Sequence, residues 1–239
     1  MERRRLVATG VAILIVVAFT LGGVVTWFLI ESGQDDSTLT RSTYRYELAV
    51  RTDTQLRNVT FRVPVPSTGG GSRIGQALLG GIGERPAGWE LSMVTTESGP
   101  MLQIRAGTIG PHNESAGTVT QSARVLLPAD RRIETRNPTG DEPLLRPRSS
   151  LVGISCTAGG DPVGCMAYEG RAYASYQTAA GANVTLEARI TGENIWERDD
   201  ELQRNAYVDF QRLRLRGPSR GWHTTGGRTW FGVGTYPGE

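Results

Sequence analysis

Alternation of apolar and polar positions over residues 43–239 predicts β-strands in most of this region. In the first two stretches, 44–51 and 58–65, an apolar side chain occupies every second position, as in a strand that is buried on one face only. A turn around residues 52–56 joins these two strands. The same period recurs in later stretches, most of them separated by turn-rich pieces: 89–96, 101–106, 119–127, 166–177, 184–190, 206–215 and 229–233.

One segment, 72–79, has the spacing of a short helix. Ile74, Leu78 and Ile82 recur at intervals of four, but glycines in and around the segment weaken a helix, so a short or frayed turn is expected. Strands without intervening helices, in a chain with 31 glycines and 12 prolines, cannot form the crossovers of a parallel sheet. The pattern therefore predicts a mainly β protein with an antiparallel β-sandwich over residues 43–239.

The stretch 206–215 contains a conflict of phase. Val208 and Phe210 fall on even positions, whereas Leu213 and Leu215 fall on odd ones, so one regular strand cannot bury both pairs on the same face. Either a bulge near Gln211 restores the phase, or both faces are covered. A bulge would leave an exposed row of arginines, formed by Arg212, Arg214 and Arg216.

Residues 6–30 form an apolar run of 25 residues without a charge. As a helix this run would span about 37 Å, more than the roughly 30 Å of a bilayer core, so it predicts a transmembrane helix that acts as a signal anchor. Three arginines precede the run and acidic residues follow it, which predicts a cytoplasmic end, residues 1–5, and an extracytoplasmic remainder. The expected partner of residues 6–30 is therefore the lipid of the cell membrane.

A cleaved signal peptide is the main alternative to the anchor. Its apolar core usually has about 7 to 15 residues and ends at a small-x-small site, and the junction at residues 28–33 offers no such site. Arg3 and Arg4 resemble a twin-arginine export signal, but the core that follows them is longer and more apolar than usual. The expected processing site of a pilin-type helix is absent. Residues 31–42 carry one apolar residue and predict a polar stalk.

All 26 basic residues are arginines, and this excludes chemistry that needs a lysine amine, such as a Schiff base or the lysine of a phosphate loop. Without the three arginines and Glu2 that precede the apolar run, residues 31–239 hold 23 arginines and 23 carboxylates. The outer domain is thus neutral in total. A long-range field that would attract a nucleic acid is therefore not expected.

Cys156 and Cys165 are the two cysteines, and they enclose a turn-rich loop with three glycines and a proline. An oxidising compartment would join them, and closing a loop of this length would stabilise the fold by about 2 to 3 kcal/mol. A redox-active pair usually has two intervening residues and not eight, so a structural disulfide is predicted. Three sequons on the predicted outer side are candidate glycosylation sites: Asn58, Asn113 and Asn183.

The segment 217–238 concentrates aromatic residues among glycines. If exposed, these rings could stack on sugars or contact the side chains of a partner, and the predicted binding surface consists of Trp222, Trp230 and Tyr236. If packed inward, the same rings would fill the core beside a final hairpin with Gly226 and Gly227 at its turn. The pattern leaves both interpretations open.

The sequence contains no motif of a phosphate loop, a zinc protease, a Cys-x-x-Cys pair or a nucleophile elbow. His112 and His223 are the two histidines, and neither neighbours a nucleophile motif. The acidic cluster at 197–201 lacks the alternating spacing of a calcium loop. No catalytic residue, metal ligand or cofactor is therefore predicted.

Several short sequence segments resemble predicted membrane-anchored surface proteins of haloarchaea, whose role is unassigned. These segments are Tyr44–Val50, Leu56–Pro66, Gly88–Trp89, Gly99–Met101 and Gly221–Trp222. Arginine without lysine fits the GC-rich coding style of that group, whereas a neutral outer domain departs from the strongly acidic composition that is usual there. The resemblance implies no catalytic residue.

Together these features predict a membrane-anchored cell-surface protein with a structural or interaction role. Its β-domain would carry the disulfide and the candidate glycosylation sites, and its partner would be another surface protein or a glycan. Glycan binding through the carboxy-terminal aromatic residues is the alternative function, and an extracytoplasmic hydrolase is a further one.

Overall fold

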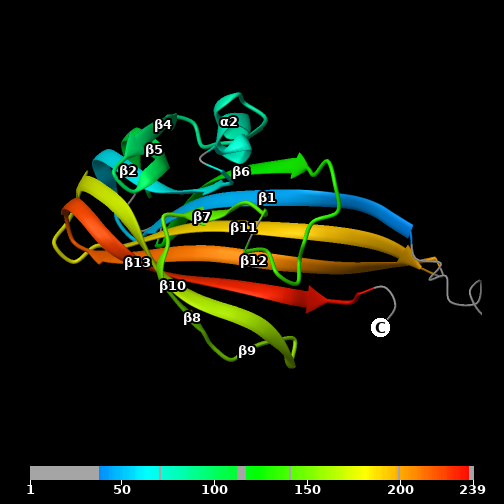
Figure 1. The fold of residues 1–239 in the computed structure, drawn as a ribbon. Coiled ribbons are helices and arrows are strands. Elements are labelled where there is room, and N and C mark those ends of the chain that lie inside the picture. The colour runs from blue at the N-terminus through cyan, green and yellow to red at the C-terminus, as the bar shows by residue number, and fades with distance from the viewer. Residues whose placement is uncertain (1–37, 70, 112–116, 140, 199, 237–239) are drawn as a thin grey trace, which may run out of the picture. The chain divides into compact units, whose positions relative to one another are not determined.

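A computed structural model describes residues 38–236 apart from 70, 112–116, 140 and 199 (Figure 1). The predicted transmembrane helix at 6–30 and the cytoplasmic end at 1–5 lie outside the described residues. In the described part of the chain, no helix has the length and apolar character needed to span a membrane. The first strand begins at Thr38, so the last five residues of the predicted stalk belong to the folded domain.

The described residues form thirteen strands, all paired antiparallel, and one short helix. The helix is α2 (Arg73–Leu79), and it begins after Ser72, whose hydroxyl accepts a hydrogen bond from the Gly75 amide. The strands are β1 (Thr38–Thr52), β2 (Leu56–Ser67), β3 (Gly83–Glu84), β4 (Glu90–Thr96), β5 (Gly99–Ile109), β6 (Val119–Pro128), β7 (Leu144–Arg146), β8 (Ser149–Gly153), β9 (Cys156–Ala158), β10 (Asp161–Gln177), β11 (Asn183–Arg198), β12 (Glu201–Arg216) and β13 (Ser219–Gly234).

These strands belong to one continuous curled sheet, where the sequence predicted a sandwich of two sheets. The main path runs β3-β6-β1-β11-β12-β13-β10-β2-β5-β4, while β7 pairs with β2, and β8 and β9 pair with β10. The long strand β10 joins the two halves of the path, because it pairs with β13 on one side and with β2 on the other. The helix α2 contacts both β2 and β6, strands from opposite ends of the path (Figure 1).

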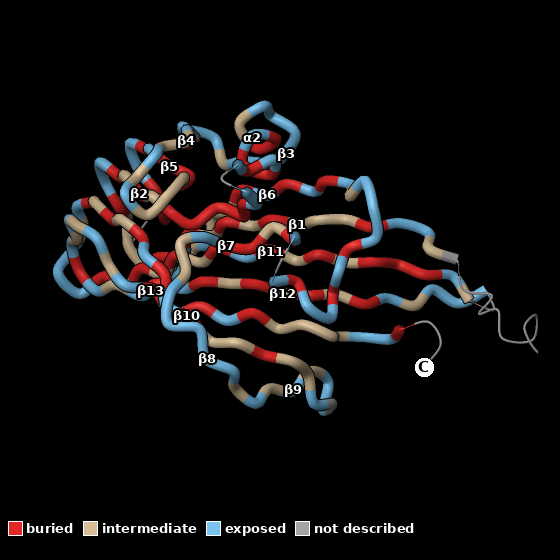
Figure 2. Tube along the Cα trace, in the orientation of Figure 1, coloured by how far each residue is buried: buried red, intermediate tan, exposed pale blue. Residues whose placement is uncertain are grey.

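The core lies on the inner face of the curl. Figure 2 shows buried and exposed positions alternating along the long strands, as the period of two predicts. Tyr46, Leu48 and Val50 of β1 are fully buried, and the intervening residues face outward. One hydrophobic cluster includes residues of β1, β2, β5, β6, β10, β11 and β12 together with Ile74 and Leu78 of α2. The predicted mainly β, antiparallel fold is confirmed.

The phase conflict in β12 has an explanation that needs no bulge near Gln211. The strand pairs with β11 residue by residue from Glu201 to Arg216, so even positions face outward throughout. Val208 and Phe210 therefore lie on the outer face, and Leu213 is buried on the inner one. The arginines at 212, 214 and 216 share the outer face with Phe210, and all three are exposed.

The predicted hairpin turn at Gly226 and Gly227 is wrong, because β13 runs unbroken from Ser219 to Gly234. Gly227 faces inward opposite Tyr168 of β10, and a Cβ on this glycine would lie 2.4 Å from the tyrosine ring. This glycine makes room for a ring and not for a turn. Glycine inside a strand often marks such a close approach.

Candidate functional site

The structure separates the three aromatic residues that the sequence grouped. Trp222 and Trp230 face outward from β13, eight positions apart, which corresponds to about 27 Å along a strand. Tyr236 follows the end of β13 and is only 5% exposed. Its hydroxyl is hydrogen-bonded to Thr135 at 2.8 Å. Tyr236 therefore belongs to the packed interior, and the two tryptophans occupy different places on the outer face.

Trp222 is the exposed member of an aromatic platform on the outer face, defined here as Trp222 and Tyr173. Trp222 is 38% exposed, and its ring meets Tyr173 of β10 edge to face with 5.5 Å between centroids. The Arg171 guanidinium lies 5.2 Å from the centre of the Trp222 ring, and the Arg62 guanidinium lies 5.1 Å from that of Tyr173. Such stacked cations hold the rings in place and present charge beside an apolar surface.

A hollow of about 470 Å³ adjoins this platform at Tyr173. Its wall is rich in groups that donate and accept hydrogen bonds. Across one side, the Asn58 amide donates to the Gln177 side chain at 3.3 Å. The hollow is lined by Asn58, Tyr173, Ser175, Tyr176, Gln177, Pro218, Ser219 and Arg220.

Sequence reasoning missed Tyr173. Tyr168, Tyr173 and Tyr176 lie in one alternating stretch, and parity sends Tyr168 and Tyr176 inward and Tyr173 outward. The sequence therefore indicated that Tyr173 faces outward, because its residue number is odd whereas those of the inward-facing Tyr168 and Tyr176 are even. Its partner could not be read from the sequence, because Tyr173 meets Trp222 only through the pairing of β10 with β13.

Trp230 forms a second, separate aromatic pair. Its ring stacks on Phe210 of β12 with 4.9 Å between centroids and 22° between planes. The Arg212 guanidinium lies 5.8 Å from the centre of the Phe210 ring. Trp230 is half-buried by this stacking, so it offers less free ring surface than Trp222.

His223 is hydrogen-bonded to Ser219 at 2.8 Å. Among the described residues no carboxylate pairs with the His223 ring, so the third member of a catalytic triad is missing from this part of the chain. His112 and Asp199 lie outside the described residues. In the described ranges, no three histidine, cysteine or carboxylate side chains gather in a way that could hold a metal ion.

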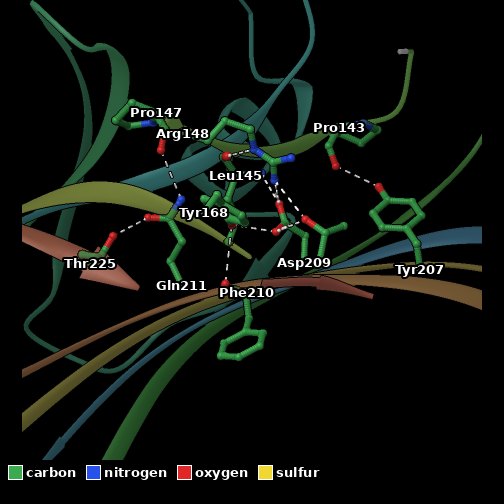
Figure 3. A network of polar contacts seen from close by, with 11 residues as sticks. Pro143, Leu145, Pro147, Arg148, Tyr168, Tyr207, Asp209, Phe210, Gln211 and Thr225 are labelled. Carbon is green, nitrogen blue, oxygen red and sulfur yellow. Dashed lines mark hydrogen bonds and ion pairs between the residues drawn. The ribbon is translucent and has the colours of Figure 1, made fainter. Parts of the chain in front are cut away.

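Among the described residues, the carboxylate that accepts the most hydrogen bonds is that of Asp209, on the inner face of β12 (Figure 3). It accepts hydrogen bonds from the Leu145 amide at 2.7 Å, the Arg148 guanidinium at 2.6 Å, the Tyr168 hydroxyl at 2.6 Å and the Thr229 hydroxyl at 3.0 Å. Burial raises the pKa of Asp209, and the Arg148 guanidinium acts in the opposite direction. Because four protein donors surround this fully buried carboxylate, it has a structural role.

Asp209 is one of three polar anchors for a strap, defined here as residues 129–139 and 141–148, which follows β6 across the inner face and includes β7. Asn194 of β11 is a second anchor, since its side chain bonds both the amide and the carbonyl of Ile133 at 2.9 Å. The third is Glu142 of the strap itself, which accepts hydrogen bonds from Tyr44 and from the Glu134 amide. Burial, followed by the bond to Glu142, raises the pKa of Tyr44.

The predicted disulfide between Cys156 and Cys165 is confirmed, and it joins β9 to β10. Of the candidate glycosylation sites, Asn58 is exposed with a left-handed φ of 52°. Asn183 is exposed at the start of β11, where its side chain donates to Asp53 at 2.6 Å. Asn113 lies outside the described residues.

Comparison of this chain with protein-family models, with curated proteins and with solved structures finds no significant match. The resemblance to haloarchaeal surface proteins is not tested by these comparisons and stays a prediction.

Proposed function

We propose that this chain is a membrane-anchored cell-surface interaction module that binds glycans through the outer face of its sheet. The observation that carries the proposal is the aromatic platform of Trp222 and Tyr173 beside a polar hollow. Residues 6–30 would hold the domain at the membrane, with the domain on the extracytoplasmic side. The disulfide supports this location, because such bonds persist in oxidising compartments.

The platform and the hollow match the two kinds of surface that a sugar ring presents. The C–H groups of a sugar pack against an aromatic ring, and Trp222 offers an exposed ring for this contact. The hydroxyl groups need donors and acceptors, which Gln177 and Arg220 supply around the hollow. The site is shallow and open, which suits reversible binding of part of a longer chain.

Substitution of Trp222 tests the proposal. In the full chain in detergent, Trp222→Ala should lower the retention of the protein on immobilised cell-surface polysaccharide by about tenfold or more, because the stacking surface is lost. Trp230→Ala is the matched control, since it removes the same side chain from the same strand and face but away from the hollow. Far-UV circular dichroism would check the fold of both variants. Equal retention of wild type and Trp222→Ala would contradict the proposal.

A further inference from the structure

The charges of the outer domain are sorted in space although they cancel in total. Part of the outer face of β6, β1, β11 and β12 carries seven exposed arginines and only two glutamates. The arginines are Arg45, Arg51, Arg124, Arg189, Arg212, Arg214 and Arg216, and the glutamates are Glu47 and Glu187. A neutral composition therefore coexists with a strongly basic surface.

A groove of about 400 Å³ lies within this surface, and five of the seven arginines line it. We call it the arginine groove. Two of its arginines are paired across strands: Arg124 with Glu47 at 2.9 Å, and Arg212 with Glu187 at 2.6 Å. The groove is lined by Glu47, Ala49, Arg51, Thr120, Arg124, Thr185, Glu187, Arg189, Arg212 and Arg214.

The other three arginines of the groove, Arg51, Arg189 and Arg214, pair with no carboxylate of a described residue. Arg51 donates instead to the Thr120 hydroxyl at 3.2 Å. Together with the two neutralised pairs, these residues leave an excess of three positive charges in one groove. Like charges at this separation repel each other, and an anionic ligand would remove the repulsion.

The strand registers show how these three arginines are spaced. Arg51 of β1 lies opposite Thr185 of β11, which lies opposite Arg214 of β12, so Arg51 and Arg214 are about 10 Å apart across the sheet. Arg189 lies four positions along β11 from Thr185, which corresponds to about 13 Å. The backbone positions of the three arginines are thus spread over about 10 by 13 Å, a spacing that suits a chain with repeated negative groups.

We infer that the arginine groove binds an acidic polysaccharide through its carboxylate or sulfate groups. This inference rests on the proposed function, because it names the class of glycan. Arginine suits such a ligand, since its planar guanidinium donates two parallel hydrogen bonds to a carboxylate or sulfate. The groove and the aromatic platform both lie on the outer face of one sheet, the groove on β6, β1, β11 and β12 and the platform on β13 and β10.

A charge-removing variant tests the inference in the full chain in uncharged detergent. Calorimetric titration would compare heparin, which is sulfated, polygalacturonate, which is carboxylated, and neutral dextran. The wild type should bind both acidic chains more tightly than dextran, with affinity that falls as salt rises from about 50 to about 500 mM. The triple variant Arg51→Gln, Arg189→Gln, Arg214→Gln should bind both acidic chains about tenfold or more weakly.

The matched control is Arg85→Gln, Arg105→Gln, Arg146→Gln, which removes the same charge from exposed positions outside the groove. Acidic-chain binding that falls equally in both triple variants would overturn the inference. A wild type that binds neither acidic polysaccharide would also overturn it. If that wild type instead binds anionic lipid vesicles or single-stranded DNA, and the groove variant does not, the groove serves a different ligand.

A comparison with Trp222→Ala separates this inference from the proposed function. If Trp222→Ala loses polysaccharide retention while the groove variant keeps full affinity for both acidic chains, the proposed function stands and the inference fails. If the groove variant alone loses affinity for the acidic chains and Trp222→Ala retains cell-surface polysaccharide as the wild type does, the inference stands and the aromatic platform is not the glycan site.

Discussion

Asp209 shows how one residue joins distant parts of the fold. Its carboxylate accepts hydrogen bonds from the strap at Leu145 and Arg148, from β10 at Tyr168 and from β13 at Thr229. The side chain of Arg148 is only 7% exposed, so neither charge of this ion pair is solvated by much water. A buried pair of this kind adds little net stability over an apolar pair, but removal of one member leaves the other charge unpaired.

The variant Asp209→Ala should therefore lower the free energy of unfolding by about 3 to 5 kcal/mol, measured by urea denaturation. Asp130→Ala serves as a control, because its ion pair with Arg73 is exposed, with side-chain exposures of 79% and 62%. Exposed pairs contribute about 0 to 1 kcal/mol. A loss below about 1 kcal/mol in Asp209→Ala would show that the strap does not depend on this anchor.

At the scale of the element, glycines inside the long strands make room for tyrosine rings. Gly192 of β11 lies opposite Tyr207 of β12, and Gly227 of β13 lies opposite Tyr168 of β10. A Cβ at either glycine would lie less than 2.5 Å from the ring that faces it. The rings are buried and fixed by hydrogen bonds, with Tyr207 donating to the Pro143 carbonyl at 2.8 Å.

Gly227→Ala should lower the free energy of unfolding by about 1 to 3 kcal/mol, because the new methyl group forces the Tyr168 ring away from Asp209. The neighbouring Gly226→Ala is the matched control, since a Cβ there meets no atom within 4 Å. Its effect should stay within about 0.5 kcal/mol. Thermal and urea unfolding would measure both, and equal losses would refute the contact with Tyr168 as the cause.

At the scale of the whole molecule, burial makes the fold sensitive to alkaline pH. Burial is the largest cause of raised pKa values at six tyrosines, and it raises the pKa of Tyr176 to about 12. In an unfolded chain the tyrosine hydroxyl ionises at about pH 10. The six tyrosines are Tyr44, Tyr46, Tyr168, Tyr176, Tyr207 and Tyr236.

The sign of the effect follows from the raised pKa values. Below about pH 10 these tyrosines are neutral in both states, and their full contribution to stability is present. Above it the unfolded chain loses protons first, so the free energy of unfolding should fall as pH rises from about 10 toward the folded pKa values. Urea denaturation between about pH 8 and 11.5 would measure this decline, which Tyr176→Phe should reduce. A flat profile would contradict it.

Much of the fold could be predicted from the sequence because the underlying signals are local. Alternation of side chains across a strand depends only on neighbouring residues, and it located the nine longest strands, the inward face of β1 and the short helix α2. The four short strands β3, β7, β8 and β9 were missed, since two to five residues are too few to show a period. The disulfide followed from the eight residues between its cysteines.

The candidate site was predicted only in part, because its residues come together through pairing between distant strands. Trp222 could be singled out as an aromatic residue in a glycine-rich segment, but the pairing of β10 with β13 was needed to bring Tyr173 beside it. The burial of Tyr236, which is hydrogen-bonded to Thr135, also depends on a contact between distant segments. The arginine groove could not be predicted from composition, because the net charge of residues 31–239 is zero. Arg51 and Arg214 lie far apart in the sequence, and only the strand order places them in one row on either side of β11.

The sequence by itself thus determined where the nine longest strands lie and which faces of β1 and β2 are apolar, because these properties depend on residues that are neighbours along the chain. Tertiary structure alone decided that the strands form one curled sheet, that Gly227 lies under a ring and not in a turn, and that seven arginines gather on one part of the outer face. Pairing between distant segments is chosen by how well whole faces pack and by which buried polar groups find partners. No local pattern encodes that choice.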